Sequence, residues 1–368
     1  MKKILIVGSG PFGATSARVL SEAGYEVTVI EKRNHIGGNC FTEEVEGVHV
    51  HTYGPHIFHT NDCSVWEWVN KYAKFNNYRH QVVANYEGET YALPFNMFTF
   101  SKLWKITSPL EAKEIIRSQS SRIGTPKNLE EHAIKMIGLD IYEKFVKGYT
   151  QKQWGRDPKD LPTFIIKRLP VRYTYDNDYF EDKYQGIPIG GYTKMFENIL
   201  EGIEVRLNTD FYENRDFYER SYDLIIYTGP IDKFFEYKHG KLEYRSLVFD
   251  TQKLEIENFQ GCAQMNYTSI KNKFTRIVEH KHFDDQGQKN TVITKEYSIE
   301  YDGSNEPFYP INNEKNNQAY SLYKKEADSL EKYVFGGRLA TFKYYDMHQV
   351  IASALSFCKK FIEKDQIS

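Results

Sequence analysis

A glycine-rich turn near the start of the chain constrains its fold more than any other feature. An apolar run, Ile4–Val7, leads into Gly8-Ser9-Gly10-Pro11-Phe12-Gly13, an alanine-rich helical pattern follows, and a second apolar run ends on Glu31. A strand, a G-x-G-x-x-G turn, a helix and a strand with an acid at its tip form the unit that holds a dinucleotide. Gly8 would make the tight turn, Gly10 would admit a pyrophosphate, and Gly13 would let helix and strand pack closely. Glycines with purely structural roles are the alternative.

Length and charge narrow the classes of protein and partner. The chain has 368 residues and a formal net charge of −2, which gives no general attraction to nucleic acid or to an anionic membrane. No apolar segment approaches the roughly 20 residues of a membrane span. We therefore expect neither a nucleic-acid nor a membrane partner. The four cysteines are widely spaced and form no C-x-x-C, which is typical of reduced thiols in a cytoplasm: Cys40, Cys63, Cys262 and Cys358.

The dinucleotide-binding pattern recurs in separate parts of the chain. The pattern appears again in a helical segment after Gly190-Gly191 and in a buried strand before Thr228-Gly229-Pro230. It appears a last time at Gly336-Gly337-Arg338. Between these parts lie a hairpin pattern at 82–94, helical patterns and several antiparallel strands. A dinucleotide domain that is interrupted in this way is more typical of flavoproteins than of simple nicotinamide dehydrogenases.

We predict an α/β fold with a discontinuous Rossmann-type FAD-binding domain, an inserted helical domain and a twisted antiparallel β-sheet domain. The FAD-binding domain would comprise residues 1–78, 188–232 and 313–368. The sheet domain would comprise 79–98, 156–187 and 233–312, and the helical domain 99–155.

Further polar motifs are candidates for chemistry. His56 and His59 stand three residues apart in one segment, but no third ligand is arranged with them, so a polar wall is favoured over a metal site. Two exposed loop histidines are the remaining alternative. Gly37-Gly38 follows the second strand and suggests backbone close to a ligand, with an ordinary turn as the alternative. Arg168, Arg172 and Arg276 are candidates for a diphosphate clamp, because guanidinium matches phosphate oxygens in a planar fork.

Taken together, the motifs resemble those of the prokaryotic UDP-galactopyranose mutases, a family of flavoenzymes. The matching segments are collinear and cover nearly the whole chain. They are Gly8–Gly13, His35–Asn39, Tyr53–Thr60, Leu93–Asn96, Lys147–Gly155, Leu169–Arg172, Tyr227–Pro230, Phe274–Ile277, Pro307–Pro310 and Gly337–Leu339.

The resemblance implies an isomerase that interconverts UDP-galactopyranose and UDP-galactofuranose by ring contraction. FAD would work in its reduced form, with N5 attacking the anomeric carbon and displacing UDP, and with no net redox change. The resemblance also implies a cytoplasmic homodimer, formed through the helical domain, that supplies galactofuranose for cell-surface glycans.

The resemblance assigns roles to matching positions. The predicted catalytic residues are Arg172, placed on a mobile loop within 156–187, with Arg276, His56 and His59. The predicted substrate contacts are Tyr149, Trp154, Arg172, Tyr184, Asn266, Arg276, Tyr309 and Tyr344; Tyr184 is chosen over its neighbours Tyr173, Tyr175 and Tyr179. The predicted cofactor contacts are Gly8, Gly10, Phe12, Gly13, Glu31, Lys32, Gly38, Asn39, His56, Arg338, Tyr344, Asp346 and Met347, and no metal is predicted.

Three alternatives stay open. The same chemistry could act on UDP-N-acetylgalactosamine or another UDP-sugar, although His59 favours galactose because relatives that accept the N-acetylated sugar can carry Arg there. A redox enzyme resembling the flavin amine oxidases would share the opening motif. A nucleotide-sugar-binding protein without catalysis is the third.

Overall fold

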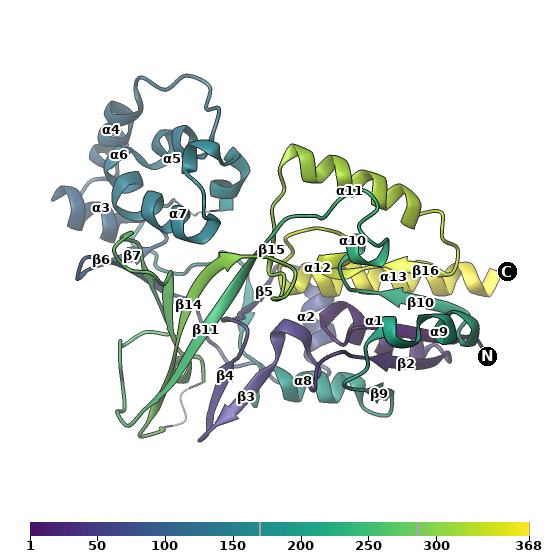
Figure 1. Cartoon of the computed structure of the whole chain (residues 1–368). Coiled ribbons are helices and arrows are strands. Elements are labelled where there is room, and N and C mark those ends of the chain that lie inside the picture. The colour runs from purple at the N-terminus through teal and green to yellow at the C-terminus, as the bar shows by residue number, and fades with distance from the viewer. Residues whose placement is uncertain (169–170, 285–286, 368) are drawn as a thin grey trace.

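Five parallel strands form one sheet in the computed structural model, which describes residues 1–168, 171–284 and 287–367 (Figure 1). Their order is β16-β10-β1-β2-β9, and every neighbouring pair is parallel. The strands are β1 (Lys3–Val7), β2 (Glu26–Ile30), β9 (Glu204–Arg206), β10 (Leu224–Tyr227) and β16 (Tyr333–Phe335). The sheet thus draws on separated parts of the chain, which confirms the discontinuous Rossmann-type prediction.

Alternate residues of β1 enter two different cores, because successive strand side chains point to opposite faces. Ile4 and Ile6 pack with α1 (Pro11–Glu22), α8 (Gly191–Leu200) and α13 (Met347–Ile367). Leu5 packs on the other face with η5 (Phe211–Asn214), α9 (Arg215–Ser221) and α10 (Ile231–Phe234). The covered sheet leaves its carboxyl edge for ligands.

A second sheet runs in the order β15-β11-β14-β13-β12-β6-β7. The expected hairpin at 82–94 is present as antiparallel β6 and β7, whereas β6 and β12 pair in parallel. That one parallel pair departs from the antiparallel prediction; its strands come from distant segments and no hairpin joins them. The strands are β6 (Val82–Tyr86), β7 (Glu89–Leu93), β11 (Tyr244–Leu254), β12 (Gln264–Tyr267), β13 (Arg276–Glu279), β14 (Thr291–Glu300) and β15 (Tyr309–Pro310).

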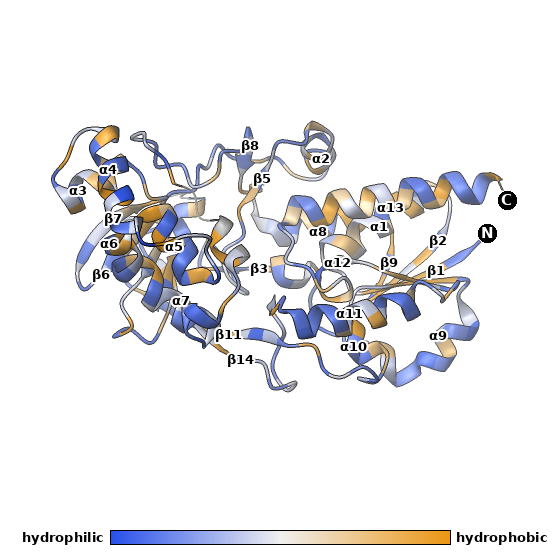
Figure 2. Cartoon of the chain, turned by 90° about the horizontal axis from the view of Figure 1, so that it is seen from above, coloured by the Kyte–Doolittle hydropathy of each residue, from blue (hydrophilic) through white to orange (hydrophobic). Residues whose placement is uncertain are grey.

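The helical region packs against β6 and β7, at the end of the molecule away from both termini (Figures 1 and 2). Ser108 caps α4 in a capping box with Glu111, as the Ser-Pro start indicates. The helices are α3 (Met97–Trp104), α4 (Pro109–Ser120), α5 (Leu129–Ile137), α6 (Leu139–Ile141), the π-helix η2 (Tyr142–Lys147) and α7 (Gly148–Trp154).

Short elements connect these bodies. β5 and β8 pair antiparallel, as do β3 and β4. The remaining elements are η1 (Gly38–Cys40), β3 (Thr42–Val45), β4 (Val48–His51), β5 (Phe58–Thr60), α2 (Cys63–Val69), η3 (Pro158–Asp160), η4 (Thr163–Arg168), β8 (Tyr184–Gly186), η6 (His280–Phe283), α11 (Glu314–Ala327) and α12 (Gly337–Ala340). Within the described ranges, no helix is long and apolar enough to span a membrane. The exact division into domains stays a prediction.

Candidate active site

The glycine-rich turn joins β1 to α1, and its three glycines are needed for different reasons. Gly8 has φ +104°, and a Cβ there would lie 2.1 Å from Thr228 Oγ1. A Cβ on Gly13 would lie 1.9 Å from the Gly8 carbonyl oxygen, so this glycine lets the helix pack on the turn. Gly10 has φ −67°, which any residue adopts, and a Cβ there would meet its nearest neighbour, Gly38 Cα, only at 3.9 Å. The surrounding protein therefore does not require glycine at this position, which leaves room for a ligand.

Glu31 stands at the end of β2, buried beside the turn. Its Oε2 accepts hydrogen bonds from the Ser9 backbone N–H at 2.9 Å and from Ser9 Oγ at 2.8 Å. Its Oε1 accepts from the Arg33 backbone N–H at 3.1 Å. These bonds aim the carboxylate along the edge of the sheet. Carboxylate oxygens have further lone pairs, with which Glu31 can receive ribose hydroxyls.

The Gly37-Gly38 pair forms a structural turn and also brings backbone to the wall of the cavity. Gly37 has φ +85°, and a Cβ there would lie 3.0 Å from the Phe196 ring, which is a structural requirement. Gly38 packs its backbone against Gly10 and lines the same cavity.

One large cavity connects the parallel sheet to the helical region and the second sheet. Its volume is about 1610 Å³, more than the roughly 300–1,000 Å³ of a pocket for one drug-sized ligand. All thirteen predicted cofactor residues line it, from Gly8 to Met347. So do His59, Tyr149, Trp154, Asn266, Arg276 and Tyr309. The predicted cofactor contacts and these predicted substrate contacts thus line one continuous space.

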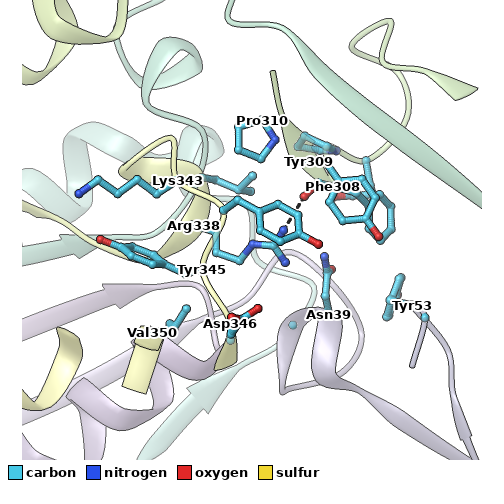
Figure 3. Close-up of a pocket in the computed structure, with 18 of the residues that line it drawn as sticks. Asn39, Tyr53, Phe308, Tyr309, Pro310, Arg338, Lys343, Tyr345, Asp346 and Val350 are labelled. Carbon is cyan, nitrogen blue, oxygen red and sulfur yellow. Dashed lines mark hydrogen bonds between the residues drawn. The ribbon is translucent and has the colours of Figure 1, made fainter. Parts of the chain in front are cut away.

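Arg338 lies at the centre of the cofactor end (Figure 3). Its Nη2 donates to the Phe308 carbonyl oxygen at 2.8 Å, and its guanidinium stacks 5.1 Å from the centre of the Tyr344 ring. Its Nε is buried and has no hydrogen-bond partner among the described residues. An unpaired buried donor is costly, so this atom indicates a ligand acceptor. Gly10 and Arg338 thus fit a bound dinucleotide.

Arg276 marks the other end of the cavity. Its Nε and Nη2 donate to Glu296 Oε2 at 2.9 and 2.7 Å, while Nη1 lies 3.5 Å from Gln264 Oε1. Burial lowers the pKa of Arg276, but Glu296, with Tyr309 and Tyr149, outweighs burial and raises it above its ordinary value. Arg276 is therefore a fixed cation. The rings of Tyr309 and Tyr344 lie 5.4 Å apart between this arginine and Arg338.

Two histidines of the cavity wall, His56 and His80, have lowered pKa values. Burial lowers the pKa of His56 to about 4, with Arg338 and Arg276 contributing, and its Nδ1 bonds the Gly54 carbonyl oxygen at 2.8 Å. Sequence analysis did not identify His80, whose pKa is lowered to about 3 by burial and by Arg276 and His59. Within the described part of the chain, no cluster of three His, Cys, Asp or Glu side chains forms a metal site.

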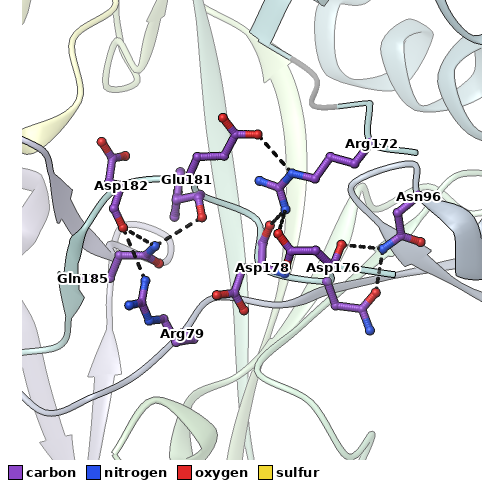
Figure 4. Close-up of polar contacts among 10 residues, drawn as sticks. Arg79, Asn96, Arg172, Asp176, Asp178, Glu181, Asp182 and Gln185 are labelled. Carbon is purple, nitrogen blue, oxygen red and sulfur yellow. Dashed lines mark hydrogen bonds and ion pairs between the residues drawn. The ribbon is translucent and has the colours of Figure 1, made fainter. Parts of the chain in front are cut away.

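Arg172 does not lie where the diphosphate clamp was expected. It is 8% exposed and lines a smaller adjoining pocket. Its guanidinium pairs with Asp176 and Glu181, each at 3.1 Å, and also bonds the Asp178 carbonyl oxygen (Figure 4). Carboxylates close to it in the sequence thus pair with Nε and Nη1, while its buried Nη2 has no hydrogen-bond partner among the described residues. The Arg168 side chain, Leu169 and Pro170 lie outside the described residues.

Tyr184 also lies away from the cavity. It begins β8 and stacks on Trp66 of α2 with ring centres 5.3 Å apart. Of the four tyrosines in this region, Tyr179 lines the cavity instead. The pairing of β8 with β5 explains the difference, because it directs Tyr184 to the α2 side.

Comparison with known proteins identifies the family. Residues 144–344 match the family described as UDP-galactopyranose mutase, and residues 6–72 match the NAD(P)-binding Rossmann-like domain. A Klebsiella pneumoniae protein named "Probable UDP-galactopyranose mutase" is 42% identical over 98% of this chain and 95% of its own. The chain belongs to the UDP-galactopyranose mutase family. It is therefore an isomerase of this flavoenzyme family, and its dinucleotide cofactor is FAD.

Two further matches describe the range of this family. The dTDP-fucopyranose mutase of Escherichia coli is 40% identical over 100% of both chains. The crystal structure of a reduced UDP-galactopyranose mutase shares the fold, with a TM-score of 0.76 and 16% identity over 99% of this chain and 94% of that one. Mutases named for two different nucleotide-sugars are therefore about equally similar to this protein.

Proposed function

We propose that this protein interconverts UDP-galactopyranose and UDP-galactofuranose. The observation that carries the proposal is the continuous cavity, which joins the FAD end at Gly10 and Arg338 to a second polar end at Arg276, Tyr309 and Tyr149. A redox enzyme with a small substrate has no need of a fixed cation and several tyrosines at the far end. A nucleotide-sugar supplies a diphosphate that such groups hold.

FAD fits the dinucleotide end, where Gly10 offers bare backbone, Glu31 a carboxylate and Arg338 an unpaired Nε. When bound and reduced, FAD supplies a nucleophilic nitrogen, N5, for the anomeric carbon, in a reaction with no net redox change.

Arg276 holds the diphosphate as it leaves and returns. The charge of Arg276 is permanent. Its Nε and Nη2 donate to Glu296, which fixes the orientation of the guanidinium, so Nη1 remains for a phosphate oxygen. A preorganised cation stabilises the negative charge that builds up on the departing diphosphate. The hydroxyl of Tyr309 lies beside it and stays protonated, since burial raises the pKa of Tyr309.

Arg172 joins the clamp by exchanging partners. Phosphate oxygens replace the carboxylates of Asp176 and Glu181, and the loop that carries Arg172 then closes over the substrate. Tyr149 and Trp154, on α7, hold the nucleobase side by stacking.

The family resemblance extends the proposal beyond the site. We expect a homodimer formed through the helical region, a cytoplasmic location, and a product that serves cell-surface glycans.

Incubation with UDP-galactofuranose, with and without dithionite, tests the proposal. Chromatography should detect UDP-galactopyranose only after reduction, and Arg276→Ala should abolish the conversion. Conversion of dTDP-fucopyranose but not of UDP-galactose would instead establish the second candidate, which the relative that is 40% identical favours. Conversion of neither nucleotide-sugar by FAD-loaded, reduced protein would overturn both.

A further inference from the structure

His59 occupies the junction between the two ends of the cavity. Its ring meets the edge of His348, on the first turn of α13, with centres 4.9 Å apart. On the other side it neighbours His80, which in turn neighbours Arg276. His348 follows the predicted FAD contacts Asp346 and Met347, and Arg276 stands at the diphosphate end. Under the proposed function, a sugar that links FAD to the diphosphate would lie against His59.

A carboxylate fixes the orientation of this histidine. Asp182 Oδ2 lies 2.6 Å from His59 Nδ1, and the ring of Phe180 stacks on the imidazole with centres 3.7 Å apart and planes 11° apart. Both residues belong to the segment that follows Arg172. The imidazole is thus held on its face by Phe180 and on its edge by Asp182, and His59 is only 8% exposed.

Asp182 is itself held from several directions. Its Oδ1 accepts from Asn61 Nδ2 at 2.6 Å. Its backbone oxygen accepts from Gln185 Nε2 at 2.8 Å and from Arg79 Nη1 at 3.3 Å (Figure 4). Asn61 cannot turn freely, because its Oδ1 accepts from the Lys183 backbone N–H at 2.9 Å.

We propose that Asp182 is a positioning residue that keeps the hydrogen of His59 on Nδ1, so that the lone pair of Nε2 accepts a hydrogen bond from a sugar hydroxyl. The inference rests on the proposed function and deepens it, because it assigns the recognition of the sugar itself to a His–Asp pair. A carboxylate at Nδ1 accepts but cannot donate, so it selects the Nδ1–H tautomer. The segment that carries Arg172 toward the diphosphate thus also sets the tautomer of the histidine at the sugar.

The hydrogen bonds around Asp182 predict how Asp182→Asn changes the tautomer of His59. The fixed Asn61 presents an N–H donor to position 182, so the new amide turns its oxygen toward Asn61 and its NH₂ toward His59. His59 Nδ1 must then accept, and the imidazole hydrogen moves to Nε2. The double variant Asn61→Ala/Asp182→Asn frees the amide to present either its oxygen or its NH₂ to His59, so part of the Nδ1–H tautomer should return.

Nitrogen-15 NMR of histidine-labelled, FAD-loaded protein at pH 8 reads the tautomer directly, with His59→Gln to assign the signals. We expect Nδ1–H in the wild type, Nε2–H in Asp182→Asn and a mixture that includes Nδ1–H in the double variant. A wild-type His59 that carries its hydrogen on Nε2, or on both nitrogens, would overturn the inference. This readout needs no substrate, so it stands or fails separately from mutase activity.

Kinetics provide the second readout. Asp182→Asn should lower kcat/KM for the nucleotide-sugar by about 10- to 100-fold, the effect of losing one buried hydrogen bond. The affinity for UDP, which lacks the hexose that faces His59, should stay within twofold, and the double variant should recover part of kcat/KM. Asp216→Asn, exposed on α9, is the matched control and should behave as the wild type. An equal loss of UDP affinity in Asp182→Asn would assign Asp182 a general structural role instead.

Discussion

Gly10 is the glycine of the opening turn that the surrounding protein does not require, and it is predicted to contact FAD. Its backbone φ suits any residue, and a Cβ there would have 3.9 Å of clearance from protein. We expect Gly10→Ala to fold normally but to bind FAD at least tenfold more weakly, because the methyl group enters the space of the pyrophosphate. Flavin fluorescence titration measures the affinity. Gly124→Ala, which has nothing within 4 Å of its Cβ, is the control. FAD affinity equal to wild type in Gly10→Ala would assign the pyrophosphate elsewhere.

Arg276 is predicted to contribute through geometry as well as charge. Lysine keeps the charge but lacks the planar fork that bonds Glu296 with two donors and leaves a third for phosphate. Arg276→Lys should therefore lower kcat/KM by about 100-fold, in the range of losing one preorganised oxyanion donor. Isothermal titration with UDP and steady-state kinetics check this. Retention of full activity by the lysine variant would show that charge alone suffices.

At the scale of elements, sequence patterns predicted the helices and strands that are determined by residues close together in the sequence. β1, α1, β2 and β10 were recognisable because apolar runs and glycines mark them within a few residues. The same patterns placed Arg276 and the Tyr149 helix in one cavity through the family resemblance. The side of β8 on which Tyr184 lies depends on pairing with β5, which is more than a hundred residues away in the sequence, and the surroundings of His80 depend on Arg276. Such long-range pairings leave no local signal.

The segment that follows Arg172 is predicted to compete with substrate for that arginine. The Glu181 side chain is 77% exposed, so its ion pair with Arg172 is worth only a fraction of the attraction between buried charges. Glu181→Gln should therefore release Arg172 and lower KM for the nucleotide-sugar two- to fivefold. Steady-state kinetics measure the change, and Glu44→Gln on exposed β3 is the control. A higher KM in Glu181→Gln would mean that Glu181 helps to bind the substrate.

At the scale of the whole molecule, four buried histidines connect stability to pH. Burial lowers the pKa of His56 to about 4 and contributes to values of about 3 for His80 and His280, and it holds the pKa of His51 well below 6.5. The unfolded chain binds protons at these residues near pH 6.5, while the folded protein does not. The unfolded state is therefore stabilised relative to the folded state as the pH falls. Stability from these groups is thus complete above pH 6.5 and is lost toward pH 4, by up to about 1.4 kcal/mol per pH unit for each histidine.

Urea unfolding of the protein at pH 8, 7, 6 and 5.5 tests this coupling. The free energy of unfolding should change little between pH 8 and 7 and fall steeply below pH 6.5. His80→Gln removes one of these titrating groups, and its amide can still accept from the Tyr78 hydroxyl, which lies 3.1 Å from His80 Nδ1. The slope below pH 6.5 should therefore become shallower in this variant. A flat profile down to pH 5.5 would mean that these histidines take up protons in the folded protein.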